Sequence, residues 1–224
     1  DLNVTRAGYN KMIKIFEEKL GDKYYLQTPQ KYPELGLLVT QIRKKGTVAR
    51  RKYDWNTKDC GVSIDIYVVE NVFDNRVKRF LQKNISMILS FSVSAIRTYN
   101  NRKIPKQLLE LENRKLNYTK LKKFFGRILG IIPIEKWIQW SEYWFSLCKN
   151  NDSKLVSIPT GRKHFSGEIY KRKDMCEYRK TRFETEYFNI PIDAEKYLKG
   201  FYGDYMKLPK KEQQEKHLFL ELRY

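Results

Sequence analysis

The chain has 224 residues, of which 41% are hydrophobic and 14% aromatic, enough apolar area for one packed domain and too much for a disordered chain. Its 45 Lys and Arg residues against 26 Asp and Glu give a formal net charge of +19, which attracts nucleic acid, anionic membrane or phosphorylated substrates. Three widely spaced cysteines and two histidines outside any HExxH pattern argue against a disulfide framework, a zinc ribbon and a zinc hydrolase.

The N-terminus predicts a short strand followed by a helix over residues 5–20. Asp1 and Asn3 alternate with apolar residues, so their side chains share one face of the strand. Apolar residues then recur at helical spacing, with Thr5 as a suitable N-cap and Gly21 at the end of the helix.

Two further strands are expected over residues 35–42 and 47–53, joined by a basic turn at 43–46. Residues 61–69 are rich in β-branched side chains, which is typical of a buried central strand, and Asp65 lies in its middle. The alternative is an Asp at a strand edge facing solvent, but apolar neighbours on both sides disfavour it. A carboxylate inside such a strand needs a partner, usually a metal or another cation.

Residues 74–150 are mostly helical and strongly basic in this interpretation. One helix carries an apolar stripe made of Leu121, Phe124, Phe125, Ile128, Leu129 and Ile132. Core packing is the favoured explanation of the stripe. Docking on an anionic membrane is the alternative, because basic residues lie beside it and tryptophans follow it. A last helix is predicted over residues 193–203, with Asp193 as its cap.

The two acidic strands together indicate chemistry on phosphate. Oxygen atoms of Asp1, Asn3 and Asp65 on neighbouring strands are ligands that one or two hard cations prefer. A metal held in this way neutralises phosphate oxygens and activates a hydroxyl nucleophile. The order of the strands resembles the nucleotidyltransferase fold, in which a D-h-[DE]-h strand precedes a strand with a third carboxylate.

The C-terminal part narrows the resemblance. Its motifs, in order, are Phe183-Glu184, Phe188-Asn189-Ile190-Pro191, Tyr197-Leu198 and Tyr202-Gly203-Asp204-Tyr205-Met206-Lys207-Leu208-Pro209. In order and spacing these motifs resemble the closing signature of the LicD family, which includes bacterial phosphorylcholine transferases and is related to fukutin. His217 lies where that family often has a histidine, and residues 41–47 and 61–67 resemble its central strands. Residues 76–158 match only loosely and are expected to form a helical, basic insertion within a single domain spanning 1–224.

The chain also departs from the family. Family members usually show a Trp and a run of Asp leading into the D-h-D strand, whereas this sequence begins at Asp1. We therefore expect a fragment whose upstream catalytic segment precedes Asp1. The second acidic position is Asn3, which offers a metal only a neutral carbonyl oxygen, and Arg6 follows more closely than in the family.

The resemblance implies an α+β, nucleotidyltransferase-like mixed sheet with flanking helices. It also implies a reaction in which an acceptor hydroxyl attacks the phosphorus of CDP-choline, or a similar CDP donor, and releases CMP. The acceptor is a cell-surface glycan or its lipid-linked precursor. Asp1 and Asp65 would be the catalytic residues and, with Asn3, would hold Mg²⁺ or Mn²⁺.

The substrate-binding residues that the resemblance implies are Arg43, Lys45, Thr47, Glu184, Tyr202 and Asp204. For the first three, contact with the donor phosphates competes with solvation of a hairpin. Glu184 either holds a cation or sugar hydroxyl or forms a salt bridge with Arg182 or Lys180. Asp204 either borders the substrate cleft or belongs to a turn that ends a helix.

Two other functions remain open at this point. One is a nucleic-acid-binding module, suggested by the charge and by the segment Tyr170-Lys171-Arg172-Lys173, although it leaves Asp65 unexplained. The other is a degenerate family member that binds glycan or nucleotide without turnover, suggested by Asn3. No apolar stretch is long enough to span a bilayer, so we expect a cytoplasmic protein in peripheral contact with the inner face of the membrane.

Overall fold

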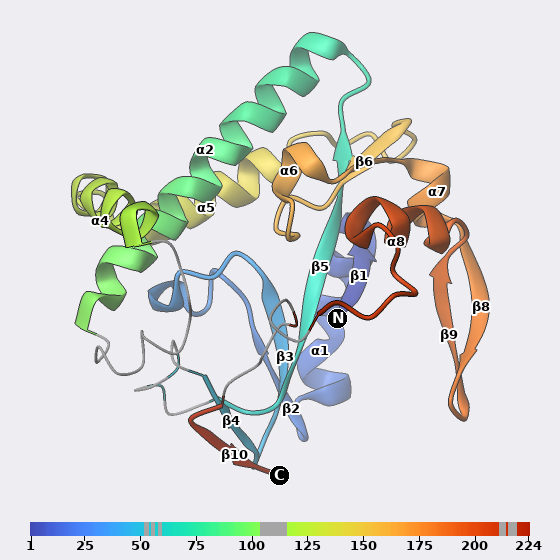
Figure 1. Ribbon diagram of the computed structural model, residues 1–224, viewed down its shortest axis with the longest axis horizontal. Helices are drawn as coiled ribbons and strands as arrows, with labels where there is room; N and C mark the ends of the chain where they lie inside the picture. Colours follow the sequence, from blue (N-terminus) through green and yellow to red (C-terminus); the bar gives the residue numbers. More distant parts are fainter. Residues whose placement is uncertain (52–53, 55–56, 58–59, 104–115, 211–213, 215–218) are drawn as a thin grey trace.

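The computed structural model describes residues 1–51, 54, 57, 60–103, 116–210, 214 and 219–224. These residues have the predicted α+β architecture, with helices beside a mixed sheet (Figure 1). The strands of the main sheet are β1 (Leu2–Thr5), β2 (Tyr24–Gln27), β3 (Thr40–Lys44), β5 (Ser63–Val72), β6 (Leu155–Ser157) and β7 (Ile169–Lys171). Two smaller pairs are β4 (Val48–Arg50) with β10 (Glu221–Arg223), and β8 (Tyr178–Phe183) with β9 (Glu186–Pro191).

β5 organises the main sheet. It pairs in parallel with β1 and antiparallel with β3 and β6. Its last four residues, 69–72, are buried, and Val69 packs with Val156, Ile158 and Met175 in one core cluster. The predicted central strand is therefore confirmed, although it begins at Ser63 and continues to Val72.

The first helix, α1 (Arg6–Leu20), confirms the prediction from helical spacing. The hydroxyl of Thr5 accepts a hydrogen bond from the backbone N–H of Gly8, satisfying one of the free donors at the helix start. Tyr9 and Phe16 lie seven residues apart, hence on one side of the helix, and both are buried.

The two strands predicted around the basic turn differ from expectation. A short 3₁₀ helix, η1 (Pro33–Leu35), ends at Gly36 with φ of 58°, so β3 starts only at Thr40. Arg43 belongs to β3 rather than to the turn. The turn itself contains Gly46, whose φ of 75° favours glycine. β4 pairs with β10, at the other end of the chain, instead of forming a hairpin with β3.

The described part of residues 74–150 is mostly helical, as predicted. Its elements are α2 (Arg76–Asn100), η3 (Asn101–Lys103), α4 (Leu116–Leu129) and α5 (Ile134–Phe145). Ile134 and Ile138 of α5 are buried against Val93 and Ile96 of α2. The predicted insertion over residues 76–158 ends inside the main sheet, because β6 pairs with β5.

The prediction of core packing for the apolar stripe on α4 was wrong. The exposed fractions of five of its side chains range from 37% to 61%, and the five are Leu121, Phe124, Phe125, Ile128 and Ile132. α4 ends at Leu129, before Ile132, and α2 covers only part of the stripe. Phe125 contacts Phe91 of α2, and Leu129 packs against the core cluster that contains Ile96.

The C-terminal part packs beside β5, across from α2 and α5 in Figure 1. Its helices are α6 (His164–Gly167), α7 (Arg172–Cys176) and α8 (Ala194–Tyr202). α8 confirms the helix predicted over residues 193–203: the Asp193 side chain accepts from the N–H of Lys196, and Gly203, with φ of 69°, ends the helix. No helix among the described residues is long and apolar enough to cross a membrane.

Candidate functional site

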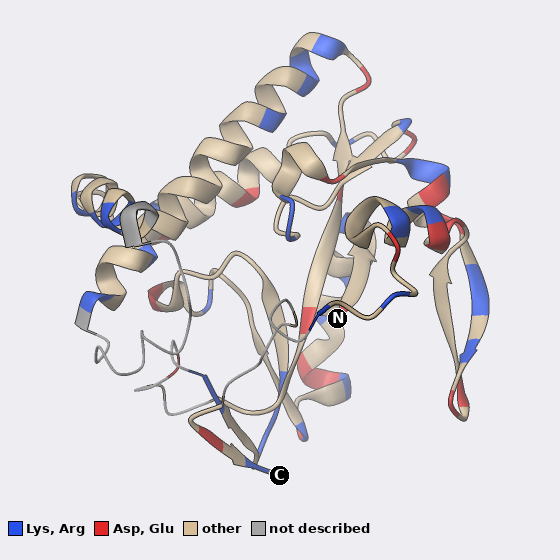
Figure 2. Ribbon diagram, viewed as in Figure 1, with Lys and Arg blue, Asp and Glu red and all other residues tan. Residues whose placement is uncertain are grey.

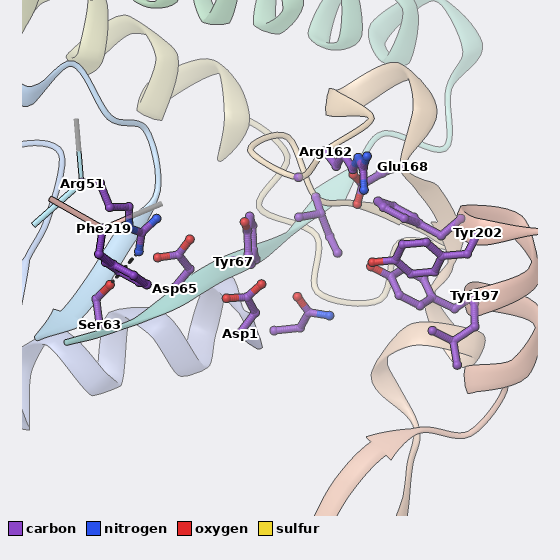
Figure 3. Close-up of a pocket in the computed structure, with 15 residues that line it drawn as sticks. Asp1, Arg51, Ser63, Asp65, Tyr67, Arg162, Glu168, Tyr197, Tyr202 and Phe219 are labelled. Carbon is purple, nitrogen blue, oxygen red and sulfur yellow. Dashed lines mark hydrogen bonds between the residues drawn. The ribbon is translucent and has the colours of Figure 1, made fainter. Parts of the chain in front are cut away.

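A cavity of about 750 Å³ lies over one face of the main sheet (Figure 3). β1 and β5 form part of its lining. Asn3 lies opposite Tyr67 in their parallel register, and the same register, continued two residues back on each strand, puts Asp1 beside Asp65. Side chains on a strand alternate between faces, so these four point the same way, and all four line the cavity.

The structure therefore brings the three predicted metal ligands together. Both Asp1 and Asp65 are among the side chains that line the cavity in Figure 3. Asp1 and Asn3 are exposed, whereas Asp65 is half-buried. Their service as metal ligands stays a prediction.

The oxygen ligands of Asp1, Asn3 and Asp65 suit a metal ion that takes its other ligands from water or substrate. Among the described residues, no group of three or more His, Cys, Asp or Glu side chains is arranged to hold a metal ion. Two carboxylates and one amide suit Mg²⁺ or Mn²⁺, which usually keep waters and take further oxygens from substrate phosphates. They do not suit a fully protein-enclosed cation.

A hydrogen-bond network behind the cavity orients Asp65. Gln41 Nε2 donates to Asp65 Oδ1 at 2.6 Å, and Arg43 Nη2 donates to Gln41 Oε1 at 2.7 Å. Gln27 Nε2 donates to the same Gln41 oxygen at 3.1 Å. These side chains come from β2, β3 and β5 at neighbouring registers, so one polar row crosses the sheet and ends at the carboxylate.

The predicted phosphate ligand Arg43 does not line the cavity. Only 2% of its surface is exposed, and its Nη1 donates to the backbone oxygen of Gly61 at 3.2 Å. Its Nη2 also lies 3.8 Å from Asp54 Oδ2. The guanidinium is thus committed to internal acceptors, because burying a charge requires partners for it.

Lys45 and Thr47 also lie away from the cavity. Lys45 Nζ donates to the backbone oxygen of Gly21 at 2.5 Å. Thr47 Oγ1 donates to the backbone oxygen of Lys44 and accepts from the N–H of Val62, both at 2.9 Å. These contacts match the alternative that both residues stabilise the local chain.

Of the predicted C-terminal residues, only Tyr202 lines the cavity. Glu184 is exposed in the turn between β8 and β9 with φ of 53°, and Arg182 Nε donates to its backbone oxygen at 2.9 Å. Asp204 is exposed after the end of α8. His217 lies outside the described residues.

Two arginines that the sequence did not single out line the cavity. Arg51 lies at the end that contains Asp65, and its Nη2 donates to Ser63 Oγ at 3.2 Å. Arg162 lies near Glu168 at the other end (Figure 3). Their only sequence signal was membership of basic stretches, which is weak in a chain with 45 Lys and Arg residues. Together they place positive charge near both ends of the cavity.

Glu168 was also missed. It is 1% exposed, yet it lines the cavity, and its Oε1 accepts from the N–H of Lys163 at 2.8 Å. Burial raises the pKa of this carboxyl above its usual range, and the Lys163 hydrogen bond offsets only part of the shift. Gly161 allows this close approach, because a Cβ there would lie 2.3 Å from Glu168 Oε1. No sequence pattern indicated the arrangement.

Aromatic rings of α8 form the wall beside Glu168. Tyr197 and Phe201 are one helical turn apart, with ring centroids separated by 5.5 Å, and Tyr170 packs 5.6 Å from Tyr197. Burial, with the charge of Glu168, raises the pKa of Tyr197 to about 12, so it stays a neutral phenol. The spacing of the first two rings was visible in the sequence. Such rings offer faces for stacking a base or contacting a cation.

Two side chains of the segment 170–173, which was considered for nucleic-acid binding, make contacts within the protein. Tyr170 packs against the core cluster that contains Val69. Arg172 Nε donates to the backbone oxygen of Ser153 at 2.6 Å, and its Nη2 donates to Asn71 Oδ1 at 2.6 Å. Neither side chain is displayed as a free contact for a nucleic acid.

No protein-family model matches the chain, and no curated protein and no solved structure matches it significantly. The residues around the cavity are therefore the evidence for a function. Four features characterise it: two carboxylates on adjacent strands, a neighbouring amide, arginines near both ends, and an aromatic wall that contains a buried carboxyl.

Proposed function

We propose that the protein is a metal-dependent transferase of the LicD type. It moves phosphocholine, or a related phospho-group, from a CDP-activated donor to a hydroxyl of a cell-surface glycan or its lipid-linked precursor. The observation that carries this proposal is the meeting of Asp1, Asn3 and Asp65 with Arg51 and Arg162 around one cavity. Acidic groups that attract a divalent cation beside fixed cations are the arrangement that a pyrophosphate requires.

The fold is consistent with a nucleotidyltransferase-like domain. β1 presents Asp1 and Asn3 and leads directly into α1, and Asp65 lies on the adjacent parallel strand β5. The resemblance to that fold was based on this order of two strands, the first with Asp1 and Asn3 and the later one with a further carboxylate.

Each group of residues has a separate task in the proposed reaction. Asp1, Asp65 and the side-chain oxygen of Asn3 would hold Mg²⁺ or Mn²⁺, which supplies charge neutralisation for the phosphates when bound. Gln41 fixes the orientation of the Asp65 carboxylate. Arg51 and Arg162 hold phosphate oxygens and stabilise the charge that passes to the leaving CMP.

The size and lining of the cavity suit the donor. Its volume of about 750 Å³ is within the range of pockets that enclose small ligands, about 300–1,000 Å³. Tyr197, Phe201 and Glu168 form an end with aromatic faces and a carboxyl group, both of which attract a quaternary ammonium. The aromatic faces of Tyr197 and Phe201 are the features of this end that favour a choline group.

A second candidate, binding of donor or glycan without turnover, is favoured by one observation. The position where the family carries a second strand acid is Asn3, so the cavity has fewer anionic ligands for a metal. Binding and turnover must therefore be measured separately.

Isothermal titration tests the proposal directly. CDP-choline, CDP-ribitol and CDP-glycerol are titrated with and without Mg²⁺. We expect CDP-choline to bind most tightly and only with Mg²⁺, because the carboxylates repel the bare diphosphate. Release of CMP in the presence of a glycan acceptor then separates transferase from binder. Failure of all three donors to bind contradicts the transferase and a donor-binding protein, and titration with the glycan acceptor then tests the remaining form of the second candidate.

A further inference from the structure

A second feature is an apolar surface on α2 and α4, on the other side of β5 from α8 (Figure 1). On α2 the side chains of Val77, Phe80, Leu81 and Ile88 recur at helical spacing and are 47% to 68% exposed. Their spacing of three, four and seven residues puts them along one stripe of the helix. Amphipathic helices normally bury such a stripe.

The stripe continues onto α4. Phe91 of α2 contacts Phe125 of α4 edge-to-face, with ring centroids 6.0 Å apart, and Phe124 contacts Phe125 at 5.6 Å. Phe124 is 61% exposed and Ile128 is 48% exposed. The contact between Phe91 and Phe125 thus connects the exposed apolar side chains of α2 with those of α4. Patches of this kind mark interaction sites when polar residues surround them.

The surrounding charge has a single sign. α2 contains five Lys and Arg residues and α4 contains four, and neither helix contains Asp or Glu. In Figure 2 the bands of charge on the two helices are accordingly blue. By helical geometry Lys120 and Arg127 lie on one side of the α4 stripe, where both are exposed. Lys122 lies on the other side, where its Nζ donates to Ser94 Oγ of α2 at 2.6 Å. The apolar stripe therefore has basic edges.

We propose that this surface docks on an anionic lipid bilayer. We call it the α2–α4 face and define it by Val77, Phe80, Leu81, Ile88, Phe124, Phe125 and Ile128 with the basic residues beside them. Insertion of the apolar side chains removes them from water, and the Lys and Arg residues contact lipid phosphates. The inference goes beyond the proposed transfer reaction and does not depend on it.

Charge complementarity selects this occupant. A nucleic acid satisfies the basic edges but leaves exposed Phe and Ile side chains in water. A second copy of the chain brings like charges together, because both faces carry only Lys and Arg. An anionic bilayer satisfies the basic edges and the apolar stripe at once, with no helix crossing the membrane.

Vesicle co-sedimentation of the full chain tests the proposal. Vesicles of phosphatidylcholine alone are compared with vesicles that also contain phosphatidylglycerol, over a range of salt concentrations. We expect binding to the anionic vesicles only, weakening as salt rises because exposed charges are screened. Replacing both Lys120 and Arg127 with Gln should weaken binding about 30-fold, since each basic residue near a membrane surface contributes about fivefold.

Matched variants on the β8–β9 hairpin provide the control. Arg179→Gln with Lys180→Gln removes the same charge from an exposed site elsewhere, and we expect almost unchanged binding. Phe80→Ser with Phe124→Ser should abolish sedimentation, whereas Phe183→Ser with Tyr187→Ser should not. All eight substituted side chains are exposed, so unchanged thermal melts will show that each variant is folded.

Three results overturn the proposal. Equal binding to neutral and anionic vesicles removes the role of the basic edges, and equal losses in the face and hairpin variants remove the role of the face. Light scattering that shows a dimer, lost in the Phe80 and Phe124 variant, makes the surface a contact between copies instead. Vesicle binding that requires both the charges and the apolar side chains of this face supports it.

Discussion

Arg43 and Asp65 lie on adjacent strands and on the same face of one sheet, but their surroundings differ. Arg43 is sealed inside the protein, with Gln41, Gly61 and Asp54 as its partners. Asp65 is half-buried at the edge of the cavity and receives a hydrogen bond from Gln41. The same polar row therefore ends in a buried ion pair on one side and in the carboxylate of the proposed metal site on the other. The role of each residue is thus decided by whether other parts of the chain bury it, and not by the fact that it is charged.

Removing Arg43 should have the largest effect on stability. Arg43→Met leaves Asp54 and the Gln41 oxygen without their cation, and we expect a loss of about 3–5 kcal/mol in the free energy of unfolding. Urea denaturation measures it. Lys45→Met is the control, because this nearby side chain is exposed and should change the value by less than about 0.5 kcal/mol. Similar losses in the two variants contradict a buried structural role for Arg43.

Gln41 links the two ends of the row and provides the next test. Gln41→Leu removes the donor that orients the Asp65 carboxylate, and we expect Mn²⁺ affinity to fall about 10–100-fold. Titration of Mn²⁺ followed by electron paramagnetic resonance measures it. Gln27→Leu, one step further from the carboxylate, should have a smaller effect. Affinity that is unchanged in Gln41→Leu means that this network does not tune the site.

Glu168 should give a smaller, pH-dependent effect. Its pKa in the folded protein is raised above 4.5, so the folded state binds this proton more tightly than the unfolded chain does. Its contribution to stability is therefore fully present below 4.5 and is lost as the pH rises through the raised pKa. Glu168→Gln keeps an acceptor for the Lys163 N–H but cannot ionise.

The variant should accordingly gain stability relative to the wild type as the pH increases from 4.5. Urea unfolding at a series of pH values gives the two curves. Parallel curves for the two proteins indicate that Glu168 has the same pKa in both states and is not desolvated in the cavity.

Local signals predicted much of this structure. Caps and helical spacing located α1 and α8, and the density of β-branched residues located β5. The convergence of Asp1 and Asp65 also followed from the sequence, because it needs only strand alternation and the pairing of two apolar strands.

The role of Arg43 depends on contacts that no local pattern contains. β4 pairs with β10, so Arg50 lies opposite Glu221, which is far from it in the sequence. The chain that follows β4 brings the Asp54 carboxylate close to the Arg43 guanidinium. Such long-range packing decides which cation is buried and which, like Arg51, lines the cavity. The prediction of core packing for the α4 stripe was wrong for the same reason, because the spacing of apolar residues identifies an apolar side of a helix but does not say what covers it.

The central claim is that Asp65 takes part in a metal-assisted donor site, and the effect of Mg²⁺ on the melting temperature tests it most directly. Thermal melts of the wild type and Asp65→Asn are recorded with CDP-choline, with and without Mg²⁺. A ligand that binds only the folded state raises the melting temperature. We predict that Mg²⁺ raises it for the wild type and for Lys45→Met but not for Asp65→Asn, which should otherwise remain folded. An equal Mg²⁺-dependent rise in Asp65→Asn, or none in the wild type, would contradict a metal-assisted donor site at this cavity.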